Sequence, residues 1–360
     1  MSNYKELDEA LSLVERLATT EQIQSLLRIH KEEGHTDVRI TAENKNAVVN
    51  RNLRDAVDAR AIDIQKVFDL IRSSEENGNQ HIFYYKVKSR AIAEALVFEN
   101  LAPRMWGANW KKKLANDFPA IRLKPNDFKY SDFRQLPKKP RDWILKIYGE
   151  ATIERYTGDQ KPEGAQFLWR KYEHEQLRIV LLARWNSPDL LEIRVDRNES
   201  RKRIEGWHNK VWEMLNPHVV RSQFAPWELS EVMKNLIKKQ VENDEVYNFR
   251  DASVIDQQRV HVSFQTESDS NKSLFSSNET RESLQSFLEA KSDCDGLTVS
   301  WRPQSNQTPE KEMKTLLGVR QTQEMQKLLG NRASNEMVVH AHCNAEDLDY
   351  VTVQLRRFSK

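Results

Sequence analysis

The 360-residue chain is 31% charged and 38% hydrophobic, and it carries nine Trp, nine Tyr and thirteen Phe. So many aromatic residues indicate packed cores rather than disorder, and the length suggests two or three domains. The sequence has no run of about eighteen apolar residues, no apolar signal-peptide core and only two cysteines. We therefore expect a protein without membrane contact in a reducing compartment, cytoplasmic or, in a eukaryote, nuclear.

Residues 1–76 predict a small helical bundle. Apolar residues recur at helical spacing along four segments, with Thr20 as the expected N-cap of the second helix and Gly34 at its end. The region holds eleven Lys and Arg against fifteen Asp and Glu, a net charge of −4. An acidic bundle of this kind often binds a protein partner.

Residues 77–250 predict a central antiparallel sheet with flanking helices. The segment His81–Val87 is aromatic and β-branched, which favours a strand, and Ser89 is placed to cap a helix after it. From Asp142 to Val195 apolar and polar residues alternate between closely spaced turn signals, which indicates an antiparallel meander. Two amphipathic helices are expected next, over 199–215 and 226–241.

A basic, proline-rich arm is expected at 103–141 within this central domain. Five of the eleven prolines fall there and the hydrophobic period is lost, so we expect no regular structure longer than a turn or two. Residues 104–143 contain eleven Lys and Arg against four Asp, while the whole chain is only +2. Such cations neutralise phosphates, and the interleaved aromatic rings can stack on unpaired bases.

The arm therefore predicts contact with nucleic acid, DNA more than RNA. A second basic run opens the helix expected at 199–215, where cations are unfavourable unless an external anion is present. The alternative is a solvated connector in the first segment and a solvated helix face in the second. The residues that we expect to contact nucleic acid are Arg104, Trp106, Trp110, Lys111, Lys112, Lys113, Arg122, Lys124, Lys129, Arg134, Lys138, Lys139, Arg141, Arg201, Lys202 and Arg203.

Residues 251–360 predict a small two-layer α+β domain with the order β-α-β-α-β-β. Its second helix is expected to end near Gly330, and its last two strands are expected over Met337–Cys343 and Tyr350–Leu355. Within the first of these strands, His340 and His342 would point to one face, as some metal sites require. Two histidines are too few ligands, so we expect no metal and no other cofactor.

The sequence contains none of the spacings that commonly mark enzymes. It has no GxxxxGK[ST], GxGxxG, GxSxG or HExxH. Asp189, Glu192 and Arg194 resemble part of a nuclease site, but the two acids are too close in sequence and the basic residue is Arg rather than Lys. We therefore expect no catalytic site.

These patterns predict an α+β fold with an N-terminal helical bundle, a central antiparallel sheet and a small C-terminal α+β domain. This order of a helical bundle followed by β-rich segments resembles that of the centromere protein N family, in architecture alone and without a motif that carries residues over. The expected function is a non-enzymatic nucleic-acid-binding adaptor subunit of a multiprotein assembly, for example a prokaryotic defence complex. The alternatives are a protein-binding scaffold or an unfamiliar nuclease. Expected partners are nucleic acid, other protein subunits and a second copy of the chain.

Overall fold

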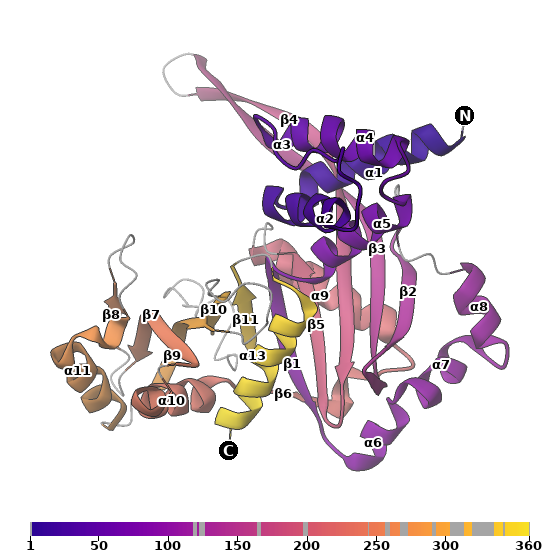
Figure 1. Ribbon diagram of the computed structural model, residues 1–360. Coiled ribbons are helices and arrows are strands. Elements are labelled where there is room, and N and C mark those ends of the chain that lie inside the picture. The colour runs from indigo at the N-terminus through magenta and orange to yellow at the C-terminus, as the bar shows by residue number, and fades with distance from the viewer. Residues whose placement is uncertain are drawn as a thin grey trace.

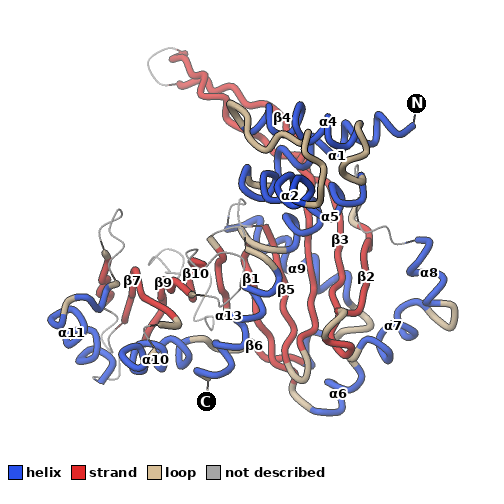
Figure 2. Tube along the Cα trace, in the orientation of Figure 1, coloured by secondary structure: helices blue, strands red, loops and turns tan. Residues whose placement is uncertain are grey.

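A computed structural model of the protein describes residues 2–117, 121, 127–163, 167–196, 201–243, 245–255, 260–266, 273–289, 293–302, 313–318, 335–340 and 343–359. The protein is a mixed α+β fold in which helices precede one large antiparallel sheet (Figures 1 and 2). This confirms the fold class that the sequence predicts. Among the described residues, no helix is long and apolar enough to cross a membrane.

The N-terminal helices form a bundle with its own apolar core. Buried residues at helical spacing, such as Leu7, Leu11 and Val14, face Ile23 and Leu27 of the next helix. The expected N-cap of the second helix is off by one residue, because Thr19 caps it and Gln22 completes a capping box. The helices are α1 (Ser2–Leu17), α2 (Thr20–Glu32), α3 (Lys45–Ala47), the π-helix η1 (Val48–Leu53), α4 (Arg54–Asp58) and α5 (Ile64–Glu76).

A single sheet runs through the rest of the chain in the order β2-β3-β4-β5-β1-β11-β10-β9-β7-β8, with β6 paired to β1. The meander expected from alternation corresponds to β3, β4 and β5, which pair in antiparallel succession. The strands are β1 (Gln80–Val87), β2 (Lys129–Leu136), β3 (Lys139–Glu163), β4 (Phe167–Asn186), β5 (Leu190–Asp196), β6 (Phe224–Pro226), β7 (Tyr247–Ile255), β8 (His261–Gln265), β9 (Asp293–Trp301), β10 (Met313–Leu317) and β11 (Glu336–Val339).

Two further apolar cores lie on opposite faces of this sheet, and β1 contributes to both. Its residues Ile82 and Tyr84 belong to one core, whereas Phe83 and Tyr85 belong to the other, as the period of two requires. The helices that pack on these faces are α6 (Arg90–Ala95), α7 (Phe98–Trp106), α8 (Trp110–Asp117) and α9 (Arg201–Leu215) in one core, and α10 (Ser230–Lys239), α11 (Asn278–Glu289) and α13 (Ala345–Phe358) in the other.

The domain boundary expected after residue 250 falls inside β7, and β11 pairs with β1. The central and C-terminal segments therefore share one sheet. Whether residues 1–76, 77–250 and 251–360 fold independently stays a prediction.

Two elements expected near the C-terminus are wrong. Residues 313–317 form strand β10 where the sequence predicts a helix, and 350–355 lie in helix α13 where it predicts a strand. The β-branched residues of α13 suggest a strand, but Asn344 and Asp347 form a capping box that starts a helix. The buried residues of α13 then follow helical spacing: Leu348, Val351, Thr352, Leu355 and Phe358.

Strands β3 and β4 continue past the sheet as a two-stranded ribbon. Strand β2 pairs with β3 only up to Tyr148, and β5 pairs with β4 only from Leu181 onward. Residues 149–163 and 167–180 pair only with each other among the described strands, and the outer part of this ribbon, residues 152–163 and 167–176, is called the hairpin arm below. The hairpin arm projects beyond the N-terminal helices, at the upper left of Figure 1.

Candidate nucleic-acid interface

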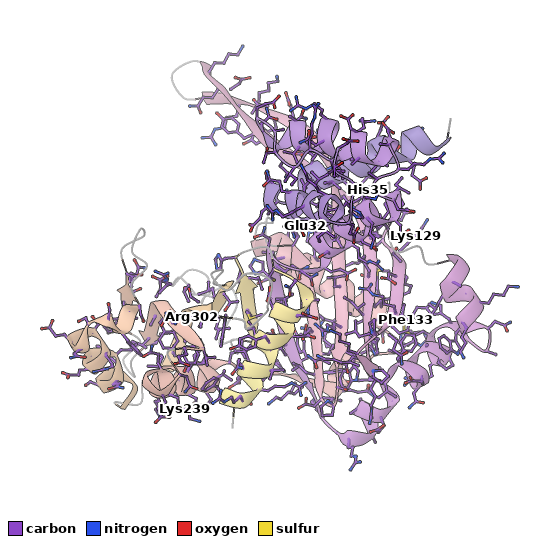
Figure 3. The ribbon with its side chains drawn as sticks, in the orientation of Figure 1. Glu32, His35, Lys129, Phe133, Lys239 and Arg302 are labelled. Carbon is purple, nitrogen blue, oxygen red and sulfur yellow. The ribbon has the colours of Figure 1, made fainter. Side chains whose placement is uncertain are left out.

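The segment expected as an irregular arm is folded onto the sheet instead. It contains the end of α7, all of α8, strand β2 and the start of β3, so the expectation of little regular structure is wrong. Aromatic residues explain the difference. The ring of Trp106 lies 4.6 Å from that of Phe133 and 6.1 Å from that of Tyr130, and Trp110 lies 5.6 Å from Phe98. These contacts fix α7 and α8 against β2 as part of a core (Figure 3 labels Phe133).

Both tryptophans of the predicted set are thus half-buried supports of that core. Their rings contact other side chains of the same chain, which leaves less of each face for a base to stack on. The two residues that sequence analysis assigned to base stacking have a packing role here.

Several of the predicted cations are bound within the chain. The Arg104 guanidinium donates to the carbonyl oxygens of Ala95 (3.1 Å) and His218 (3.0 Å). Arg141 pairs with Glu94 at 2.6 Å. Arg104 and Arg141 are exposed, so these contacts hold them in place without removing them from solvent.

Three more cations contact carboxylates of neighbouring elements. Lys138 lies 3.0 Å from Glu346, and Lys139 lies 2.9 Å from Asp349, both acids of α13. Arg134 of β2 pairs with Asp132 and with Glu76 at the end of α5. Four acidic residues from other parts of the chain, Glu76, Glu94, Glu346 and Asp349, therefore offset part of the charge excess of seven that the sequence shows between 104 and 143.

Within the described part of the predicted set, the lysines of α8 are exposed next to one another. Trp110 and Leu114 are one helical turn apart and pack on the core, which places Lys111, Lys112 and Lys113 on the rest of the helix surface. All three lysines are exposed, and among the described residues no ion pair involves them. The Lys111 ammonium lies 5.5 Å from the centre of the Trp110 ring.

Lys129 is likewise exposed, at the start of β2, the strand against which α8 packs (Figure 3). Arg122 and Lys124 lie outside the described residues, as do the side chains of Arg201 and Lys202 in the first turn of α9. Arg203 is half-buried and interacts within the chain. Among the lysines of the set whose side chains the structure describes, those of α8, Lys129 and Lys138 are exposed.

Sequence analysis missed a buried ionic cluster that joins the N-terminal bundle to the sheet. The side chain of Lys146 is fully buried and lies 3.2 Å from Glu75 and 2.7 Å from Glu76. Arg178 donates twice to Glu75, from Nε at 2.9 Å and from Nη2 at 2.8 Å, and the Tyr148 hydroxyl donates to the same carboxylate. The side chains that bind the Glu75 carboxylate in this cluster thus come from β3 and β4.

Charge pairing governs ionisation in the cluster. Burial alone would raise the pKa of Glu76, but the positive charges of Lys146 and Arg134 outweigh it and hold that pKa below its usual range. Burial, together with the Glu75 carboxylate, raises the pKa of Tyr148 well above its usual value, so its hydroxyl stays a donor. The cluster is closed to solvent, so it stabilises the contact between α5 and the sheet and offers no surface to a ligand.

A signal for this cluster was present in the strands. Lys146 stands between Leu145 and Ile147, which face the apolar core, so its own side chain points to the other face of the sheet. Because β3 is a central strand, that face can be covered as well. Arg194 and Glu192 occupy equivalent positions of β5, are buried, and pair at 2.6 Å. Charged residues at alternating positions of a central strand therefore indicate buried ion pairs.

The two acids of the nuclease alternative pair with different arginines. Glu192 is fully buried against Arg194, and Asp189 pairs with Arg356 at 2.9 Å. His340 follows β11, and His342 lies outside the described residues. Within the described part of the chain, no three His, Cys, Asp or Glu side chains gather as metal ligands would.

A cavity of about 480 Å³ lies at the end of the sheet where β1 leads into α6. Lys88, Arg90 and Arg141 line it together with Glu94 and Asp189, so opposite charges nearly cancel. It therefore offers no strong preference for an anion.

Comparison with models of known protein families finds none that matches this chain, and comparison with curated proteins finds no significant relative. Function is therefore inferred from the geometry of the chain.

Proposed function

We propose that this protein is a non-enzymatic nucleic-acid-binding subunit of a larger cytoplasmic or nuclear assembly, and that it contacts phosphate through α8. The observation that supports the proposal is the exposed set of Lys111, Lys112 and Lys113 on a helix that Trp110 and Leu114 hold against a core. A fixed helix presents its ammonium groups at low entropic cost, and each phosphate that they neutralise releases counterions.

Duplex DNA is the preferred ligand in this proposal. Lysine ammonium groups bind phosphate as point charges and carry no base preference. Trp106 and Trp110, which could favour single strands by stacking, are instead packed against Phe133 and Phe98. Binding should therefore be insensitive to base sequence. It should favour a duplex over a single strand, because a duplex carries more phosphate charges per unit length.

The direct test is a fluorescence-anisotropy titration of a labelled duplex with the triple variant Lys111→Glu, Lys112→Glu, Lys113→Glu. Three attractions become repulsions, so the affinity should fall at least about tenfold at moderate salt. The matched control is Lys31→Glu, Lys66→Glu, Lys238→Glu, which makes the same change in net charge at exposed lysines elsewhere. Equal loss in both variants would show that only total charge matters, and no binding by the parent protein would remove nucleic acid from the function.

A second candidate function is a protein-binding scaffold without nucleic-acid contact. The observation that favours it is the hairpin arm, in which every described side chain of 152–161 and 170–174 is exposed. An isolated two-stranded ribbon is only marginally stable in water, so a partner that covers it would stabilise it. Acidic residues outnumber basic ones over 150–176, six to four, which favours protein over phosphate as that partner.

A further inference from the structure

No other described strand pairs with the hairpin arm, which leaves it two edges, and they differ. Along the β3 edge the register with β4 shifts between Tyr156 and Gln160, where Gly158 has a φ of 89°. A bulge of this kind twists a strand and disrupts the row of backbone groups that a new strand would need. In β4, residues 167–170 and 172–180 pair with β3, and only Lys171 lies opposite the shift, so the extra residues of the bulge belong to β3 and not to β4. The β4 edge is therefore the one suited to accept another strand.

The sequence along that edge is self-complementary. Residues 170–175 read Arg-Lys-Tyr-Glu-His-Glu, with the basic residues on one side of Tyr172 and the acidic residues on the other. When two such edges run antiparallel, each basic pair meets the acidic side of the other copy. Opposite charges placed across antiparallel strands stabilise them, and like charges destabilise them.

Strand geometry selects one register. Directly opposite residues of an antiparallel pair point to the same face, and successive residues point to opposite faces. A two-fold axis between two identical strands must therefore pass through a residue. An axis at Lys171 or Glu173 sets like charges against each other, whereas an axis at Tyr172 sets Lys171 opposite Glu173 of the second copy twice.

The opposite face of that register is equally favourable. The Tyr172 rings of the two copies become direct neighbours. Within each chain the centres of the Tyr156 and Tyr172 rings already lie 5.7 Å apart. Tyr156 and Tyr172 are among the few large apolar side chains exposed in the described residues, at 40% and 49%. Arg170 already lies 5.9 Å from the Tyr156 ring in each copy, and this register sets it diagonal to Tyr172 of the second copy, where it can contact that ring as well.

We propose that two copies of this chain associate by pairing their β4 edges antiparallel about Tyr172, which turns two hairpin arms into one four-stranded sheet. Each copy uses the same residues, as a two-fold contact requires. The exposed ion pair of Lys171 with Glu173 within each chain, at 3.2 Å, is exchanged for two such pairs between chains. The inference does not depend on phosphate contact by α8.

The proposal is tested by charge exchange in sedimentation-velocity experiments. The parent protein should form dimers. Lys171→Glu alone and Glu173→Lys alone should each weaken dimerisation by at least about tenfold, because each variant sets like charges opposite each other across the axis. An equimolar mixture of the two variants should recover the dimer, because Glu at 171 of one chain then faces Lys at 173 of the other.

A disulfide test fixes the register. Directly opposite Cα atoms lie about 4.5–5.5 Å apart, within the range that a disulfide spans. Tyr172→Cys should therefore give a covalent dimer under mild copper–phenanthroline oxidation. His174→Cys, two residues along the same strand, should not, because its two copies are four residues out of register.

Each other outcome overturns the proposal. A parent protein that stays monomeric at high micromolar concentration contradicts it. Dimers that form equally well in both single variants place the contact elsewhere. Failure of the mixed variants to pair, or cross-linking at 174 rather than at 172, excludes this register.

Discussion

The same two strands and the same sheet face carry a tyrosine–arginine contact twice, once in the body of the protein and once on the hairpin arm. In the body, the Arg178 guanidinium lies 4.1 Å from the Tyr148 ring, and both side chains bind Glu75 of α5. On the arm, Arg170 lies 5.9 Å from the Tyr156 ring, and both residues are exposed.

The difference lies in what covers each contact. A helix of the same chain supplies carboxylates to the body, so its charges are buried, paired and committed to stability. No described helix covers the arm in this way. Its charged side chains therefore stay in water, contribute little to stability and can contact a partner. Burial thus separates cations that hold the fold from cations that can act outside it, and the lysines of α8 belong with the second group.

The largest expected effect is in the body. Lys146→Met removes one partner of two buried carboxylates, which should lower the free energy of unfolding by about 3–5 kcal/mol. The matched change on the arm, Lys171→Met, removes an exposed pair and should cost less than about 1 kcal/mol. Urea unfolding followed by tryptophan fluorescence, at a concentration where the protein is monomeric, measures both. Equal costs would mean that the body and the arm do not differ in this way.

The cluster also predicts how stability depends on pH. Glu76 of the cluster, and the paired carboxyls Glu192 and Asp349 elsewhere on the sheet and α13, have pKa values held below their usual ranges. Stability should therefore be full above the ordinary glutamate value of 4.5 and should fall as the pH drops below it, because the folded state must then take up protons against its ion pairs. Glu76→Gln should flatten this fall in urea titrations at successive pH values. A stability that rises on acidification would contradict the pairing.

The smallest expected effect on the body comes from removing the arm. Replacing residues 152–176 by Asn-Gly joins Ala151 to Leu177, which are already opposite each other, through a two-residue turn. The free energy of unfolding of the body should change by less than about 0.5 kcal/mol, since the deleted side chains described are exposed or nearly so. A large loss in thermal unfolding would show that the arm supports the sheet.

Sequence patterns predicted the fold where one interaction dominates. Helical spacing marks α1, α2 and α5, and alternation marks the strands of the meander, because one buried face decides each element. The same patterns failed at α13, where the β-branched residues Val351, Thr352 and Val353 outweighed the capping box at Asn344. They also failed at 313–317, where strand pairing with β9 and β11 decides the structure.

The candidate site was predicted only in part, for a physical reason. A count of charge along the chain cannot show which acids approach from elsewhere, such as Glu76 on Arg134, Glu94 on Arg141 or Asp349 on Lys139. Proline spacing likewise suggested an irregular arm because it does not register the packing of Trp106 on Phe133. The contact of each predicted residue with nucleic acid stays a prediction.

The central claim is that Lys111, Lys112 and Lys113 neutralise phosphates, and the salt dependence of duplex binding measures that most directly. Each phosphate contact contributes about 0.9 to the slope of log affinity against log salt concentration. Changing the three lysines to Gln should therefore reduce the magnitude of that slope by about 2–3. An unchanged slope in the variant, with the parent protein binding the same duplex, would contradict the claim.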